Sequence, residues 1–171
     1  FMLISCGCVM SWDLWVFAAD TPMDVDDAGH ARFADDFSPS PLGTPDEVRS
    51  TLSQVFPALD WADPTWGQLE GDGFSIEFPL GDEDPCRTLI LFARGNATAA
   101  ALRLIDATGW CLLDTGNGGW MNLSADPDAG RRAFEAYLST ALRAARMERN
   151  ADQSAASPPG RRGLFSRLFG R

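Results

Sequence analysis

The segment TLILFARGNATAAALRLIDATGWCLLDTGNGGW, residues 88–120, decides the fold. It begins with an apolar run at Thr88–Ala93, which predicts a buried strand. Asn96 then stands where a helix N-cap is expected, and the helix that follows is predicted to end at Gly109. Trp110–Asp114 predicts the next strand, so a helix connects two strands of one sheet.

The residues after this segment complete the sheet and then form a helix. A tight turn at Thr115–Gly119 leads into a closing strand at Trp120–Leu123, and Asp126-Pro127 is a typical helix start. The helix that follows carries a stripe expected to face the core: Phe134, Tyr137, Leu138, Ala141, Leu142 and Ala145.

The residues before the segment predict the rest of the sheet. Trp12–Ala18 is mostly apolar and predicts a central strand, and a long polar loop with a short helix near His30–Phe37 follows it. Thr44-Pro45-Asp46-Glu47 is a capping box that starts a helix to about Phe56. A hairpin turn at residues 70–73 separates two further strands, Trp66–Leu69 and Phe74–Leu80. We therefore predict an α+β domain over residues 10–149, with a mostly antiparallel sheet of about five to six strands, helices on one side, and a long C-terminal helix.

Charge is distributed unevenly along the 171 residues. Residues 1–130 hold 21 acidic residues and 5 arginines, a net charge of −16, whereas residues 131–171 hold 9 arginines and 3 acidic residues, a net charge of +6. The overall charge of −10 argues against a nucleic-acid partner. This asymmetry indicates an acidic domain with a basic tail.

The residue inventory excludes several chemistries. The chain has no lysine and one histidine, which rules out a lysine Schiff base, a P-loop lysine and a multi-histidine metal site. Its four cysteines form neither a zinc spacing nor a disulfide framework, so buried thiols in a reducing cytoplasm are expected. No metal or other cofactor is predicted.

Both ends of the chain differ from the domain in composition. Met10 is the expected native start, and residues 1–9 form a leader in which Leu3-Ile4-Ser5-Cys6 fits a lipoprotein cleavage pattern without its basic and apolar signal segment. Residues 150–160, NADQSAASPPG, predict a flexible linker. No stretch reaches the roughly 18 apolar residues of a membrane span.

The last eleven residues, 161–171, form a basic amphipathic segment. At about 100° per residue its apolar side chains fall on one arc and its polar ones on the other. The apolar residues are Leu164, Phe165, Leu168 and Phe169, and the cations are Arg161, Arg162, Arg167 and Arg171. Such a segment is typical of reversible attachment to an anionic membrane surface or to a groove in a partner protein.

Two resemblances accompany these patterns. The segment 163–170, GLFSRLFG, resembles the C-terminal membrane-targeting helix of Min-type cell-division ATPases, which implies membrane attachment and nothing of the ATPase activity. The opening MSWDLWVF at 10–17, the strand FSIE at 74–77 and the segment 109–115 resemble a group of uncharacterised small bacterial proteins, which implies no activity.

Four further patterns are candidate sites, each with a structural alternative. Asp114-Thr115-Gly116 resembles the aspartic-protease signature, for which a dimer would supply the second aspartate, but it also suits a hairpin turn. Residues 24–35 have part of the acid spacing of a calcium loop. His30 is a candidate partner of Cys86 or Cys111 in a nucleophilic dyad, the alternative being buried, inert thiols. Two tryptophans near a loop, Trp61 and Trp66, are candidates for a contact surface, whereas core packing is expected of the others.

These patterns together favour a non-enzymatic bacterial protein of the cytoplasm that attaches through its tail to the inner face of the membrane or to a partner groove. The alternatives are an acidic inhibitor or immunity-type protein that binds a basic partner such as a nuclease toxin, and a dimeric aspartic hydrolase that uses Asp114.

Overall fold

A computed structural model describes residues 10–156, with side chains to residue 149. The predicted leader, 1–9, and the basic tail, 161–171, lie outside the described residues. The chain divides into two compact units, residues 1–135 and 136–171, and the long helix begins in the first and continues in the second.

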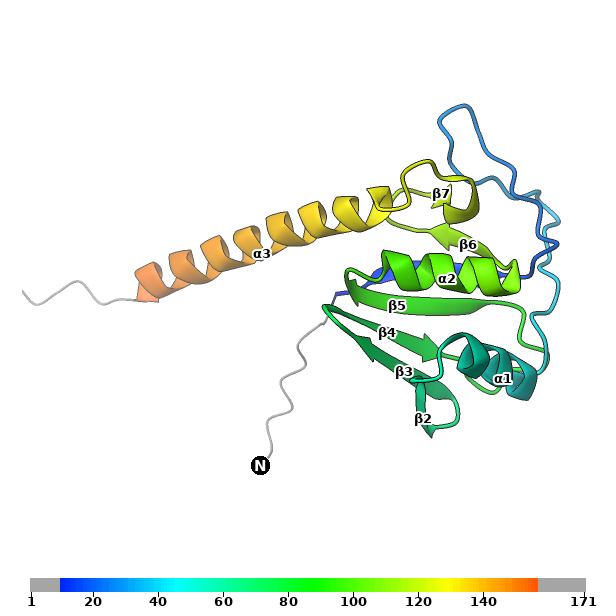
Figure 1. Cartoon of the computed structure of the whole chain (residues 1–171). Coiled ribbons are helices and arrows are strands. Elements are labelled where there is room, and N and C mark those ends of the chain that lie inside the picture. Colours follow the sequence, from blue (N-terminus) through cyan, green and yellow to red (C-terminus); the bar gives the residue numbers. More distant parts are fainter. Residues whose placement is uncertain (1–9, 157–171) are drawn as a thin grey trace, which may run out of the picture. The chain divides into compact units, whose positions relative to one another are not determined.

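The α+β fold is confirmed, with one antiparallel sheet of seven strands in the order β2-β3-β4-β5-β1-β6-β7 (Figure 1). The strands are β1 (Trp12–Phe17), β2 (Asp60–Asp63), β3 (Trp66–Gly71), β4 (Phe74–Pro79), β5 (Leu89–Gly95), β6 (Cys111–Asp114) and β7 (Gly119–Trp120). As predicted, β1 is internal, and it pairs with both β5 and β6. The most N-terminal strand is therefore held by two strands that follow it by more than 70 residues.

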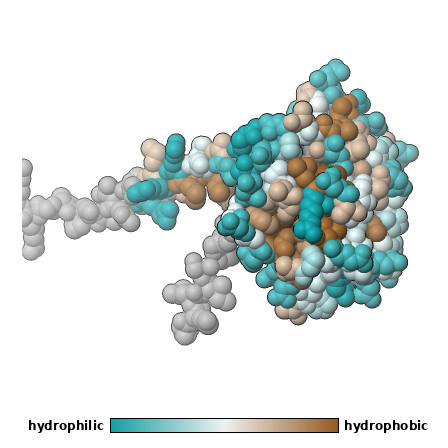
Figure 2. Space-filling view, viewed as in Figure 1, coloured by the Kyte–Doolittle hydropathy of each residue, from teal (hydrophilic) through white to brown (hydrophobic). Residues whose placement is uncertain are grey.

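Helices α1 (Pro45–Val55) and α2 (Thr98–Thr108) lie on the same face of the sheet (Figure 1). Alternate residues of β1 and β5, such as Leu14 and Leu91, are buried beneath them. Apolar surface lies around the two helices in Figure 2. The Arg103 guanidinium of α2 stands 5.6 Å from the centre of the Phe56 ring. The main core is thus a sheet with two helices on it.

Part of the opposite face is covered by the long loop between β1 and α1. Phe17, Cys111 and Trp120 are buried there, packed against loop residues that include Met23 and Phe37. The loop has an isolated bridge between Val25 and Ala31 and no helix at His30–Phe37, so that prediction was wrong. Its acidic residues favour turns over helix because their carboxylates accept hydrogen bonds from nearby backbone amides.

Three further predictions differ from the structure in detail. The N-cap of α2 is Ala97, which makes no side-chain cap bond, rather than Asn96. Strand β7 ends at Trp120, and Met121–Leu123 form a short 3-10 helix instead of continuing the strand. Strand β2 was not predicted, because its sequence, DWAD, is short and half polar and its side chains are mostly exposed.

The long helix α3 (Ala129–Ala156) begins three residues later than Asp126 and continues past residue 149. Residues 150–156, which were expected to belong to a linker, are therefore helical. Phe134 packs against the main core, but Tyr137 and Leu142 are 63% and 57% exposed. The prediction that the whole stripe faces the core was thus wrong: a 3.6-residue period marks an apolar face and does not say what covers it.

Candidate functional site

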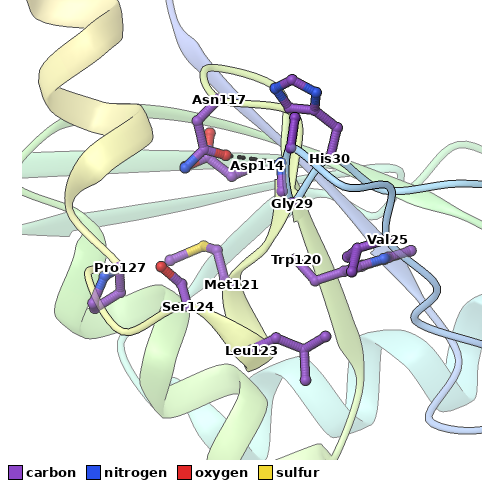
Figure 3. Close-up of a pocket in the computed structure, with 12 residues that line it drawn as sticks. Val25, Gly29, His30, Asp114, Asn117, Trp120, Met121, Leu123, Ser124 and Pro127 are labelled. Carbon is purple, nitrogen blue, oxygen red and sulfur yellow. Dashed lines mark hydrogen bonds between the residues drawn. The ribbon is translucent and has the colours of Figure 1, made fainter.

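The globular unit contains a pocket of about 350 Å³ (Figure 3). Its walls come from the loop at 25–30, the end of β6, the β6–β7 turn, the 3-10 helix and Pro127. The lining residues are Val25, Ala28, Gly29, His30, Asp114, Asn117, Gly119, Trp120, Met121, Leu123, Ser124 and Pro127. A volume of this size lies at the lower end of the range for small-molecule sites, so the pocket is a candidate that must be judged by its chemistry.

Most of the polar atoms around this pocket serve the turns that build it. The Asn117 Oδ1 accepts the Gly119 backbone N–H at 2.8 Å, and the Ser124 Oγ accepts that of Asp126 at 3.1 Å. The rest of the lining is mainly apolar, with Trp120, Met121 and Leu123 along one side. The pocket therefore presents few polar groups that converge on a ligand.

Asp114 is the most buried ionisable group at this site, with 1% of its surface exposed. Its Oδ1 accepts the Trp12 Nε1–H at 2.7 Å and the Gly116 N–H at 2.8 Å, while its backbone oxygen accepts the Gly118 N–H at 2.8 Å. Burial raises the pKa of this carboxyl above its ordinary value, against the lowering effect of the Trp12 hydrogen bond. The Asp-Thr-Gly segment is thus the turn between β6 and β7, which is the structural alternative that the sequence left open.

The second oxygen of Asp114, Oδ2, has no hydrogen-bond partner and packs against the first turn of α3. A Cβ placed on Gly130 would lie 1.7 Å from this oxygen, so no larger residue fits there without a shift. The start of a helix carries partial positive charge, which favours a carboxylate at this position. The Oδ2 atom is thus buried between the β6–β7 turn and the start of α3.

The acidic loop forms a turn around Asp26. The Asp26 Oδ1 accepts the backbone N–H groups of Ala28 and His30, both at 2.9 Å, and these bonds lower the pKa of Asp26, with that from His30 the largest cause. The His30 Nδ1 lies 3.5 Å from the Asp26 Oδ2. Within residues 10–149, no three His, Cys, Asp or Glu side chains are grouped to hold a metal ion.

The two described cysteines are buried thiols. The Cys86 Sγ donates to the Thr88 carbonyl at 3.4 Å, and that of Cys111 lies 3.8 Å from the Thr21 carbonyl. Burial raises the pKa of both thiols, which disfavours the reactive thiolate. His30 is paired with Asp26, so the geometry does not support a histidine–cysteine dyad.

The two tryptophans predicted as contact residues have structural partners. The Trp61 Nε1 donates to the Ser53 Oγ on α1 at 3.0 Å, and its ring closes over Gly67, where a Cβ would lie 2.9 Å from it. Trp66 packs near Phe92, with ring centres 6.2 Å apart. Trp61 therefore ties β2 to α1, and Trp66 is half-buried on the sheet.

The division into two units coincides with the division of charge. Residues 1–135 hold 22 acidic residues and 7 arginines, a net charge of −15, and residues 136–171 hold 7 arginines and 2 acidic residues, a net charge of +5. All the predicted attachment residues, from Arg161 to Arg171, belong to the second unit and lie outside the described residues. No helix within residues 10–156 has both the length and the apolar character needed to cross a membrane.

Comparisons with protein-family models, with curated proteins and with solved structures found no match. The class that the fold defines is an α+β domain of seven antiparallel strands and two covering helices, followed by a long C-terminal helix. A functional assignment therefore depends on the residues of this chain alone.

Proposed function

We propose that this is a non-enzymatic bacterial protein whose basic C-terminal unit attaches it reversibly to the anionic inner face of the cytoplasmic membrane. The coincidence of the structural and charge divisions carries the proposal: the unit of charge −15 ends at residue 135, and the unit of charge +5 starts at 136. The attachment residues are those of the sequence prediction, four apolar side chains and four arginines within 161–171.

The balance of energies favours weak attachment. Each Leu or Phe that is fully buried contributes roughly 1.5–3 kcal/mol, and each arginine near an anionic surface about 1 kcal/mol. Ordering about eight residues costs on the order of 1 kcal/mol each. The sum is small and depends on anionic lipid, which is what reversible attachment requires.

The described part of α3 supports this arrangement as a spacer. From Ala136 to Ala156 the helix rises about 30 Å at 1.5 Å per residue. Electrostatic repulsion between exposed charges is screened over about 8 Å at physiological salt. A helix of this length therefore allows the acidic domain to stand beyond the range at which an anionic surface would repel it.

Co-sedimentation with vesicles tests the proposal. The full chain is expected to sediment with vesicles that contain anionic lipid and to remain in the supernatant with zwitterionic ones, while a chain truncated after Ser157 remains there with both. Two double variants separate the contributions of apolar surface and of charge. Phe165→Ser with Leu168→Ser removes apolar surface and keeps the positive charge. Arg161→Gln with Arg162→Gln removes positive charge and keeps the apolar surface.

Equal sedimentation of the full and truncated chains would overturn the membrane proposal. A tail that binds a protein groove instead would leave vesicle binding absent. Binding to a basic protein that survives truncation would favour the inhibitor-type alternative, in which the acidic domain makes the contact.

A further inference from the structure

The second half of α3 presents an apolar face that the described residues leave open. At about 100° per residue, Tyr137, Leu138, Ala141, Leu142 and Ala145 fall within an arc of about 140°. The two largest flanking side chains, Tyr137 and Leu142, are mostly exposed. Apolar side chains on α3 are also visible at the surface in Figure 2. A helix of this kind ordinarily buries such a face against another element.

The order of side chains along this face points to its own copy as the partner. Two pairs of one large and one small residue lie symmetrically about the middle of the face, Leu138 with Ala145 and Leu142 with Ala141. In an antiparallel pair Leu138 stands opposite Ala145, and Leu142 opposite Ala141. Each large side chain then fills the space beside a small one, as close packing requires. A parallel pair would set leucine against leucine and alanine against alanine.

Charge favours the same orientation. Arg149 lies on the line of the apolar face near its C-terminal end. Glu135 lies near its N-terminal end, where its half-exposed carboxylate also pairs with Arg131 of the same helix at 2.7 Å. Antiparallel pairing brings Arg149 of one copy near Glu135 of the other. Parallel pairing would place Arg146 beside Arg146 and Arg149 beside Arg149, which is unfavourable.

We infer that two copies of this chain associate through antiparallel pairing of their α3 helices over residues 137–145. The contact is one helix face on another, which is small beside the roughly 1,200–2,000 Å² of a stable interface. The dimer therefore forms and dissociates with protein concentration. It does not require the proposed membrane attachment, but it would place two attachment segments in one particle and so strengthen binding through avidity.

Sedimentation velocity of the full chain without lipid, over a series of concentrations, tests the dimer. The mean mass is expected to rise with concentration from monomer toward dimer. Leu138→Asp is expected to abolish the rise, whereas Ser139→Asp, which adds the same charge on the opposite face of the helix, leaves it. Circular dichroism checks that both variants retain the helix.

A swap of large and small residues tests the orientation. Leu138→Ala leaves alanine opposite alanine, and Ala145→Leu sets leucine opposite leucine, so each alone weakens the antiparallel dimer. The two changes together restore a large residue opposite a small one and are expected to restore the dimer. The orientation is decided by Ala145→Leu alone, which weakens an antiparallel dimer by overpacking but strengthens a parallel one by adding a second leucine pair.

The inferred dimer would be overturned if the natural chain stays monomeric at every concentration. It would also be overturned if the Leu138→Asp and Ser139→Asp variants lose the rise in mean mass equally. A stronger dimer in Ala145→Leu, or failure of the double variant to recover, would overturn the antiparallel orientation. Neither result bears on the vesicle experiment, since a monomer with an active tail still binds anionic lipid.

Discussion

At the scale of single residues, Asp114 holds three parts of the chain at one point. Its carboxyl accepts the indole N–H of Trp12, 102 positions earlier, caps its own turn through Gly116, and packs under the first turn of α3 at Gly130. No short sequence pattern contains this contact, because its members are distant along the chain. The sequence suggested a turn or a catalytic aspartate, and the geometry supports the turn.

The raised pKa of Asp114 predicts a distinctive dependence of stability on pH. The folded protein holds this proton more tightly than the unfolded chain, so Asp114 stabilises the fold below its ordinary pKa of 3.8, and this contribution is lost as the pH rises through the folded value. Asp114→Asn stays neutral and keeps an oxygen for the Trp12 indole. As the pH rises from about 4 to 7, we expect the free energy of unfolding of the variant to increase relative to that of the natural chain. Urea unfolding of both proteins measures this difference.

The control for this prediction is Asp114→Ala. It leaves the Trp12 indole N–H buried without an acceptor, which costs about 1–3 kcal/mol relative to Asp114→Asn at every pH. If the free energies of unfolding of Asp114→Asn and of the natural chain change with pH in parallel, the buried Asp114 carboxyl does not cause the pH dependence.

At the scale of elements, the sequence predicts best where one short pattern defines a boundary. The Thr44 hydroxyl accepts the Glu47 N–H and the Glu47 carboxylate accepts the Thr44 N–H, so α1 begins as the capping box predicts. The hairpin between β3 and β4 likewise follows its turn signal. By contrast, Trp61 of β2 packs on α1 and Gly67, and the four-residue sequence of this strand does not reveal that packing.

Loss of the α1 cap gives a prediction at this scale. Thr44→Ala removes the acceptor for the Glu47 N–H and is expected to lower the free energy of unfolding by about 1 kcal/mol. Ser50→Ala, on the exposed face of the same helix, is the matched control and should change it little, because no cap depends on Ser50. Thermal unfolding of the two variants side by side measures the difference, and an equal effect of both would contradict the role of the cap.

At the scale of the whole molecule, the sequence predicts the distribution of charge and the fold class but not which elements contact one another. The boundary between acidic and basic sequence was predicted near residue 130, and the structural division at 135 agrees with it. The apolar stripe of α3 was also predicted, yet its burial was not, because periodicity marks the face alone. The pocket escaped prediction because two segments that are distant in the sequence, 25–30 and 114–127, build it.

The charge division predicts how salt affects attachment. Raising the salt screens both the attraction of the basic tail to anionic lipid and the repulsion of the acidic domain. We expect the first effect to dominate, since in the proposal the tail and not the domain contacts the lipid, so vesicle binding should fall steadily as salt increases. Binding that strengthens with salt would mean that the acidic domain itself lies at the surface.

The internal position of β1 has a consequence for how the protein is made. Within this domain β1 is synthesised before its two neighbours, β5 and β6, which are complete only after residues 95 and 114 have been added. Asp114, which accepts the Trp12 indole N–H, is also added late, and Gly130 of α3, which packs on Asp114, is added later still. The nascent domain must therefore carry the hydrophobic segment of β1 without its partner strands through most of its synthesis.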